Sequence, residues 1–528
     1  MGNVPSILKN ANIIPIHKGK GSSKTEAKNY RPIALTSHLI RIFEKVIRKY
    51  IVCYMDSNDL FNPSQHGFRT GRSCLSQLLS HYEHILQLME DGHEVDILYL
   101  DFAKAFDKVD FDILLKKLHS LGVRGNLGRW IHSFITGRTQ TINVNGKRSS
   151  PSPVLSGVPQ GSVLGPLLFL ILIGDIDKEL ASAFLSSFAD DTRMGHSTDS
   201  TAEKTQLQND LNVVYRWTEN NNMELHGDKF EHLHYTGKLM KDRQPPHPYT
   251  SSSGIVIEEK THVEKDLGVV MSNTATFDKH ITQVISDASR QASWVLRTFT
   301  TREKTPMLTL FKSLVQCKLD YCSQLWSPTS KGDINRLEMV QRNFLRKISG
   351  ISRLPYWDQL KNLKLYSQER RRERYMIIYV WRILEGQVPN TSDNERGSIR
   401  LKINHRHGEE DRLGRKCDIP SIITSSIAHV RNLREASLCV RGQKLFNILP
   451  KDLRNVTGCR KETFKSALDK YLSTVPDEPH IQGYVQMRRA DSNSLLDMVK
   501  FANSEAHKRA RVEVVHTPAR SGCAPMLP

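Results

Sequence analysis

Three aspartates stand at the ends of apolar, strand-like runs. Asp190 and Asp191 follow Phe188-Ala189, and Asp101 ends the run Ile97-Leu98-Tyr99-Leu100. Adjacent carboxylates repel each other and are costly to desolvate, so a half-buried pair needs a compensating cation. A third carboxylate alongside them completes an all-oxygen site that suits Mg²⁺. Two such ions about 3.5–4 Å apart support phosphoryl transfer, and this is the chemistry that the three residues predict.

Strands and turns must bring these aspartates together. Val95–Leu100 is predicted to be a strand, and Ala183–Phe188 a second strand that leads into a hairpin turn carrying Asp190 and Asp191. A hairpin is predicted at 140–155, with its turn at Asn145-Gly146. Other apolar patterns predict helices at 75–89 and 207–217, a helix from just after Val109 to Leu118, and short strands around 233–235 and 267–270. We therefore expect an α+β fold for about 300 residues, followed by a mainly α-helical region.

The charge of the chain is unevenly distributed. Its net charge is +19 over 528 residues; residues 1–330 hold 38 Lys and Arg against 34 Asp and Glu, whereas residues 331–528 hold 37 against 22. A basic C-terminal third beside a nearly neutral body suggests a polyanionic partner, and a solvated basic surface is the alternative. The cluster Gln368–Arg374, which precedes the aromatic stripe Tyr375, Tyr379 and Trp381, is a candidate for contacts with a duplex backbone.

Cysteine usage and hydropathy narrow the class of protein. The eight cysteines are scattered without a Cys-x2-Cys pair, so we expect free thiols and no zinc site. The longest apolar run, Val163–Ile173, contains Gly165 and Pro166 and is too short to span a bilayer. We therefore expect an intracellular protein, located in the nucleus and cytoplasm, that is not secreted and does not bind a membrane.

Five motifs occur in an order that resembles a known family. They are Asn29-Tyr30-Arg31-Pro32-Ile33, Gln65-His66-Gly67-Phe68-Arg69, Asp101-Phe102-Ala103-Lys104-Ala105-Phe106-Asp107, Ser156-Gly157-Val158-Pro159-Gln160-Gly161-Ser162 and Phe188-Ala189-Asp190-Asp191. Together they resemble the reverse transcriptase of non-LTR (LINE-type) retrotransposons of the jockey-like group. The resemblance covers roughly residues 10–275 through specific motifs, and looser helical patterns to about 475.

The resemblance implies a right-hand polymerase with an antiparallel palm sheet. It assigns residues 1–94 to fingers that are truncated at the N-terminus, 95–275 to the palm with interleaved fingers elements, and 276–350 to a helical thumb. Residues 351–475 would form a basic helical region with a polar linker near 389–415, and residues 476–528 a mostly disordered tail. The endonuclease domain of the family is expected to be missing. The oligomeric state stays open.

The resemblance also assigns roles to single residues. Asp101, Asp190 and Asp191 would bind two Mg²⁺ ions, with Mn²⁺ as a substitute, for the extension of a DNA primer on an RNA template with dNTPs. By contrast, Asp107, Asp110 and Asp112 lie on a predicted turn and helix start just downstream of Asp101, and we expect them to be turn or helix-cap residues. The remaining assignments are Phe106 beneath the incoming sugar, Gln160 and Gly161 in a nucleotide-positioning loop, Arg31 and Arg41 (in preference to Arg69 and Arg72) at the triphosphate, and Lys229 as proton donor to the leaving group.

Two departures from the family pattern keep alternatives open. His226 and Gly174 stand where the family usually has asparagine. A non-catalytic nucleic-acid-binding relic of a retrotransposon polymerase is therefore the alternative to an active enzyme. A polymerase adopted by its host, such as a telomerase or an intron maturase, fits the residues after 275 less well. For Lys229, an exposed lysine without a catalytic role is the alternative.

Overall fold

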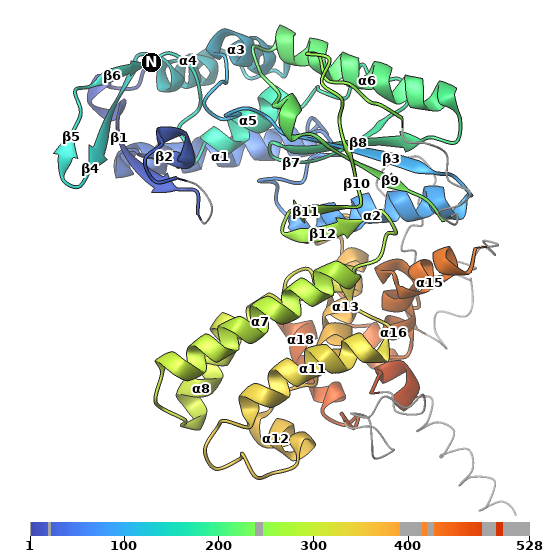
Figure 1. Ribbon diagram of the computed structural model, residues 1–528. Helices are drawn as coiled ribbons and strands as arrows, with labels where there is room; N and C mark the ends of the chain where they lie inside the picture. Colours follow the sequence, from blue (N-terminus) through green and yellow to red (C-terminus); the bar gives the residue numbers. More distant parts are fainter. Residues whose placement is uncertain are drawn as a thin grey trace, which may run out of the picture. The chain divides into compact units, whose positions relative to one another are not determined.

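The computed structural model of the chain describes residues 2–19, 23–237, 247–390, 414–419, 427–477 and 493–499 (Figure 1). It divides into two compact units. Of the described residues, those up to Thr276 and residues 427–430 form unit 1, and the others form unit 2. Most of the expected linker and most of the expected C-terminal tail lie outside the described residues. Among the helices that the structure describes, none combines the length and the apolarity needed to span a membrane.

The first sheet of unit 1 has the strand order β2-β1-β4-β5, and β6 also pairs with β4. Its strands are β1 (Asn10–His17), β2 (Tyr30–Leu35), β4 (Arg138–Val144), β5 (Lys147–Arg148) and β6 (Ser152–Val154). The expected hairpin is confirmed: Asn145 and Gly146, both with positive φ, connect β4 to its antiparallel partner β5. Such a pair of left-handed residues gives the turn a twist that matches the flanking strands.

The second sheet has the order β10-β9-β3-β8-β7 and carries the aspartates. Its strands are β3 (Val95–Leu100), β7 (Phe184–Phe188), β8 (Asp191–Ser197), β9 (Glu231–Tyr235) and β10 (Glu259–Lys260). All its pairings are antiparallel except that of β9 with β10. The central strand β3 is apolar except for Asp96 and is almost wholly buried because both of its faces are covered.

Helices cover both faces of the second sheet (Figure 1). The helices of unit 1 are α1 (His38–Ser57), α2 (Cys74–Glu90), α3 (Phe111–Ser120), α4 (Gly125–Ile135), α5 (Gly165–Ile173) and α6 (Thr201–Asn220), with 3₁₀ turns at Ser6–Leu8, Ala27–Asn29 and Gly227–Lys229. Leu98 and Met194 share one core with α5 and α6. Tyr99 and Arg193, on the opposite face, lie on the side of α2, where His81 contacts the Tyr99 ring.

Side chains at the helix starts fix several of these helices. Ser73 and Ser200 each form a capping box at the start of α2 and α6, and Asp110 caps α3 by accepting a hydrogen bond from the Ile113 backbone N–H. These caps satisfy amides that have no partner within the helix. The buried Glu44 of α1 does the same for α5, since it accepts from the backbone N–H groups of Val163 and Leu164 at 2.6 and 2.8 Å.

A two-stranded hairpin ends unit 1. It pairs β11 (His262–Asp266) with β12 (Val269–Ser272) in antiparallel fashion. The expectation of a strand around 267–270 is wrong in its first half, because Leu267 and Gly268 both have positive φ and form the turn between the two strands. Two residues in this backbone region make a tight connection and cannot continue a strand.

Unit 2 is helical, as the change of period after Met271 predicts. Its elements are α7 (Asp278–Thr298), α8 (Lys304–Leu310), η5 (Phe311–Gln316), α9 (Cys317–Asp320), α10 (Ser323–Trp326), α11 (Lys331–Leu345), α12 (Tyr356–Leu363), α13 (Gln368–Leu384), η6 (Leu438–Gly442), α16 (Gln443–Asn447), α17 (Lys451–Arg454) and α18 (Lys461–Leu472), with α15 (Ala428–Ala436) at the division between the units. Its core includes Trp381, whose ring stacks on Phe464 at 4.5 Å between centroids.

Glu338 provides a test of the unit 2 core. This buried side chain on α11 accepts hydrogen bonds from the Tyr356 hydroxyl and, at 2.7 Å, from the Gln368 backbone N–H, and burial raises its pKa to about 7. Between its ordinary value and about 7, the unfolded chain loses this proton and the folded chain keeps it. The free energy of unfolding should therefore fall by about 3 kcal/mol as pH rises from about 4.5 through about 7.

The variant Glu338→Gln should remove this component and gain about 3 kcal/mol relative to the natural protein between pH 5 and pH 8. Urea unfolding of the whole chain, followed by tryptophan fluorescence at both pH values, measures the difference. The signal reports mainly on unit 2, because four of the six tryptophans lie at 294, 326, 357 and 381. A stability difference that stays constant between the two pH values would contradict the expected titration.

Candidate active site

The pairing of the second sheet brings the three aspartates together. Leu100, the last residue of β3, pairs with Thr192 of β8, so Asp101 and Asp191 follow at the same end of the two strands. Phe188 pairs with Asp191, and Ala189 and Asp190 form the turn between β7 and β8. Ala189 has a φ of +57°, a left-handed conformation that makes this turn tight.

The charges of the cluster act on the pKa values of the two neighbouring aspartates. Burial raises the pKa of Asp190, the charges of Asp191 and Asp101 raise it further, and Arg31 opposes them. Desolvation also raises the pKa of Asp191, Arg193 opposes it and the charge of Asp101 adds to it. Carboxylates that raise one another's pKa in this way are stabilised in their ionised form by a shared cation.

Lys229 joins this cluster. Its Nζ lies 2.9 Å from Asp101 Oδ2, and its side chain is 61% exposed. The segment before it runs antiparallel to the end of β3, because Phe102 forms a β-bridge with Leu225 and the His226 N–H donates to the Asp101 carbonyl at 2.8 Å. The structure thus places this lysine beside the aspartates rather than elsewhere on the surface.

The loop that contains Gln160 and Gly161 is held by hydrogen bonds to three other segments. The Ala34 N–H of β2 donates to the Gln160 carbonyl at 2.7 Å, and Arg41 of α1 donates to the Gly161 carbonyl at 3.2 Å. The Gln160 side-chain amide donates to Asp107 at 3.1 Å. Gly161 has a φ of +112°, and a Cβ there would lie 2.9 Å from the Ala34 oxygen, so the position requires glycine.

Asp107 is a turn residue, as predicted, since its N–H donates to the Lys104 carbonyl at 2.9 Å, and its side chain also contacts the Gln160 loop. Burial raises its pKa, and the hydrogen bond from Gln160 opposes that rise. Asp110, three residues later, is the helix cap that the pattern predicts. The two residues are alike in sequence, and only the return of the Gln160 loop onto the first one separates their roles.

Phe106 lies at the edge of the core, five residues after Asp101. Its ring stacks on Phe169 of α5, with centroids 4.6 Å apart, and meets Phe68 edge-on at 6.2 Å. It is half-buried, and its carbonyl accepts from the Val158 N–H at 2.8 Å. One face of the ring is thus fixed by the core, which gives the site a rigid aromatic side chain.

The four candidate arginines differ in what they already contact. Arg69 and Arg72 donate to backbone carbonyls of their own loop, at 3.1 Å to Asn62 and 2.6 Å to Pro63, and Arg69 also stacks over Phe61. Arg31 is exposed, and its charge lowers the pKa of Asp190. Among these arginines, Arg31 is the one whose charge acts on an aspartate of the cluster.

The motif Gln65-His66-Gly67 cradles the turn between β7 and β8, a role that its sequence does not reveal. The Gln65 Oε1 accepts from Ala189 N–H at 2.7 Å and from Gly67 N–H at 2.8 Å, and its amide nitrogen donates to the Ala189 carbonyl at 3.1 Å. A Cβ on Gly67 would lie 2.4 Å from the Ala189 nitrogen. The residue immediately before Asp190 is therefore held on both of its peptide groups.

Replacing Gln65 with leucine should lower turnover by roughly a hundredfold. Without Gln65 the turn shifts and moves Asp190, and a shift of about 1 Å in a reacting group can cost about a hundredfold in rate. It should also destabilise the fold by about 1–3 kcal/mol, since three buried backbone groups lose their hydrogen-bond partners. Gln208→Leu is the matched control: Gln208 of α6 makes the same two-way contact with the backbone of Thr250, at 2.8 and 3.1 Å. Steady-state kinetics and thermal unfolding of both variants make the test, and equal losses of turnover would contradict the assigned role.

The basic cluster of α13 does not offer free cations, so its predicted contact with a duplex backbone is wrong. Arg371 binds Asp320 through two nitrogens at 2.9 and 2.8 Å, and Arg374 binds Asp469 at 2.7 Å. Arg370 and Arg372 are 0% and 4% exposed. These arginines hold the helices of unit 2 together.

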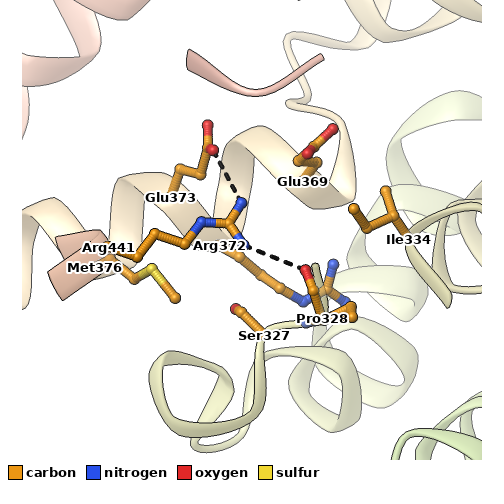
Figure 2. A pocket seen from close by; sticks show the side chains of 8 residues that line it. All are labelled: Ser327, Pro328, Ile334, Glu369, Arg372, Glu373, Met376 and Arg441. Carbon is orange, nitrogen blue, oxygen red and sulfur yellow. Dashed lines mark hydrogen bonds and ion pairs between the residues drawn. The ribbon is translucent and has the colours of Figure 1, made fainter. Parts of the chain in front are cut away.

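Figure 2 shows a small pocket beside the same helix, where Arg441 lies between Glu373 and the Pro328 carbonyl. It is lined by Ser327, Pro328, Ile334, Glu369, Arg372, Glu373, Met376 and Arg441 and has about 10 Å³ of space for water. This volume holds about one water molecule and is too small for a nucleotide.

The donor set of the aspartate cluster fits a hard divalent cation. Three carboxylates, two of which have raised pKa values, supply the oxygen ligands that Mg²⁺ prefers. In the described part of the chain, no three His, Cys, Asp or Glu side chains are arranged to hold a metal ion as they stand. Asp101 instead faces the ammonium group of Lys229.

Comparison with known proteins shows which sequences the chain resembles. Residues 16–270 match the family described as reverse transcriptase (RNA-dependent DNA polymerase). The RNA-directed DNA polymerase from the mobile element jockey of Drosophila melanogaster is 29% identical over 66% of this chain and 38% of its own length. The probable polymerases from transposon BS and transposon X-element of the same species are 26% and 28% identical, over 71% and 63% of this chain.

The chain spans 37–42% of the length of these relatives. A solved structure of telomerase from Candida tropicalis with a fragment of telomeric RNA covers 88% of this chain and 65% of its own, with 12% identity and a TM-score of 0.42. Residues 16–270 thus contain a reverse transcriptase domain, and the chain is homologous to the RNA-directed DNA polymerases of the jockey, BS and X-element retrotransposons.

Proposed function

We propose that this chain is an RNA-directed DNA polymerase that extends the 3′ end of a DNA primer on an RNA template. The observation that carries the proposal is the convergence of Asp101, Asp190 and Asp191 at one end of β3 and β8, within a reverse transcriptase domain. The three carboxylates would hold two Mg²⁺ ions, for which Mn²⁺ would substitute. When bound, the ions activate the primer hydroxyl and neutralise charge on the triphosphate.

The chain's own residues would orient the substrates. The loop of Gln160 and Gly161 offers backbone at close approach, and its ties to β2, α1 and Asp107 keep it rigid. Arg31 is exposed, and its charge lowers the pKa of Asp190. Its planar guanidinium group would bind the phosphate oxygens of a dNTP beside the aspartates. Arg41 would contribute a second cation from α1.

Lys229 would donate a proton to the leaving pyrophosphate. Its ammonium group now neutralises Asp101 at 2.9 Å, and a cation bound to that carboxylate would release the lysine toward the phosphates. Phe106 would present its edge to the sugar, and the Phe169 ring behind it would prevent it from yielding to a 2′-hydroxyl. Each of these roles uses a contact that the fold already fixes.

Primer extension tests the proposal directly. The purified chain receives a heteropolymeric RNA template, an annealed DNA primer, all four dNTPs and Mg²⁺, beside the same reaction with Asp190→Ala. Extension to the template end that disappears in the variant supports the polymerase. A protein that binds the hybrid with a steep salt dependence, yet never extends the primer, would instead be the non-catalytic relic.

A further inference from the structure

A buried ion pair lies next to the aspartate cluster. Arg193 is on β8, two residues after Asp191, and Asp266 is the last residue of β11. Their side chains are 2% and 0% exposed, and the guanidinium donates a hydrogen bond to the Asp266 carboxylate. The hairpin of β11 and β12 thus contacts the strand that carries Asp191 through two opposite charges.

Packing alone does not account for this pair. Buried ion pairs are often no more stable than apolar side chains of the same volume, because both charges lose their hydration. Within the described residues, Arg193 Nε and Nη1 and Asp266 Oδ2 have no hydrogen-bond partner. The guanidinium therefore keeps donors that a second anion could use.

Asp191 is that second anion. Side chains alternate along a strand, so Arg193 and Asp191 project from the same side of β8. The two groups act on each other: Arg193 favours the ionised form of Asp191, and Asp191 adds to the charges that favour the Arg193 cation. A guanidinium with free donors binds a neighbouring carboxylate through both oxygens, which are the atoms that a metal needs.

We propose that Asp266 is a positioning residue for the metal site: by holding the Arg193 guanidinium, it keeps the carboxylate oxygens of Asp191 available to a divalent cation. Asp266 touches no substrate and acts through Arg193 alone. The inference rests on the proposed polymerase function, because it takes the three aspartates as the metal ligands.

The test is a titration of the full chain with Mn²⁺, without nucleic acid or dNTP, by calorimetry and by electron paramagnetic resonance of the free ion. Asp266→Asn removes the carboxylate that holds Arg193 and leaves its unpaired donors to compete for Asp191, so the Mn²⁺ affinity should fall at least about tenfold. The double variant Arg193→Met with Asp266→Leu removes the competing cation together with its partner. Its Mn²⁺ affinity should return to within about twofold of the natural protein.

Two results would overturn the inference: an unchanged affinity in Asp266→Asn, or an equal loss in the single and double variants, which marks a purely structural role. Asp266→Ser makes the same test if the asparagine variant fails to fold. Glu373→Gln breaks the buried Arg441–Glu373 pair of unit 2 and should leave Mn²⁺ affinity unchanged. If the natural protein binds no more Mn²⁺ than Asp190→Ala does, the metal site itself fails, and with it the proposed function.

Discussion

Replacing Asp190 with asparagine should lower the rate of primer extension at least about a thousandfold and leave the protein folded. The carboxylate is one of three that would hold the ions, and metal ions supply several kcal/mol of transition-state stabilisation in such sites. A loss of about 4 kcal/mol corresponds to a thousandfold change in rate. Single-turnover extension on an RNA template with saturating dNTP measures the effect on the chemical step.

The same substitution should not weaken the fold, because Asp190 sits in a turn where its neighbours repel it. Asparagine removes that repulsion and keeps the shape of the side chain, so the thermal midpoint should stay the same or rise. Asp110→Asn is the matched control: it removes a carboxylate charge, keeps an oxygen that caps α3 and should leave extension nearly unchanged. Extension by Asp190→Asn within tenfold of the natural rate would show that the aspartate cluster is not the polymerase site.

Replacing Phe106 with valine should allow ribonucleotides into the product. The ring is fixed from behind by Phe169, and removal of its outer part opens space where a 2′-hydroxyl would lie. One steric contact of this size discriminates between substrates by roughly 10- to 200-fold, so the preference for dNTP over rNTP should fall by about that factor. The ratio of kcat/KM for dCTP and CTP on one template measures it.

Phe134→Val controls for the loss of an aromatic ring, because Phe134 is buried and stacks on Trp130 in the same way. It should lower stability by about 1–3 kcal/mol and leave the sugar preference unchanged. If the Phe106 and Phe134 variants have the same sugar preference, Phe106 does not contact the sugar of the nucleotide.

The strands and the aspartate triad could be predicted because their signals are local. Apolar runs of strand length end at Asp101 and lead into Asp190, and Asn145-Gly146 marks its own turn. The same local logic fails for Leu267, whose left-handed backbone depends on the hairpin that forms around it. Apolar character alone does not separate a strand from a turn that packs against one.

The remaining parts of the site depend on partners far away in sequence. Gln65 meets Ala189 across 124 residues, and Asp107 gains its role only when Gln160 returns to it. Arg371 and Arg374 are cations in the sequence and parts of ion pairs in the fold, because Asp320 and Asp469 lie on other helices. A run of basic residues can form a binding surface or a set of internal ion pairs. The sequence pattern does not show which, because it does not show where the acidic partners lie in the fold.

The place of β3 in the middle of the second sheet has a consequence for synthesis. Val95 pairs with Ser197 on one side and with Tyr235 on the other, so both edges of this apolar strand stay open until β8 and β9 have left the ribosome. Pairings that wait for such distant partners form slowly, and an open apolar edge invites association between chains. A nascent chain that ends before β9 would therefore carry the three aspartates but leave one edge of the strand β3 unpaired, so translation rate and chaperone supply should govern how much folded protein a cell obtains.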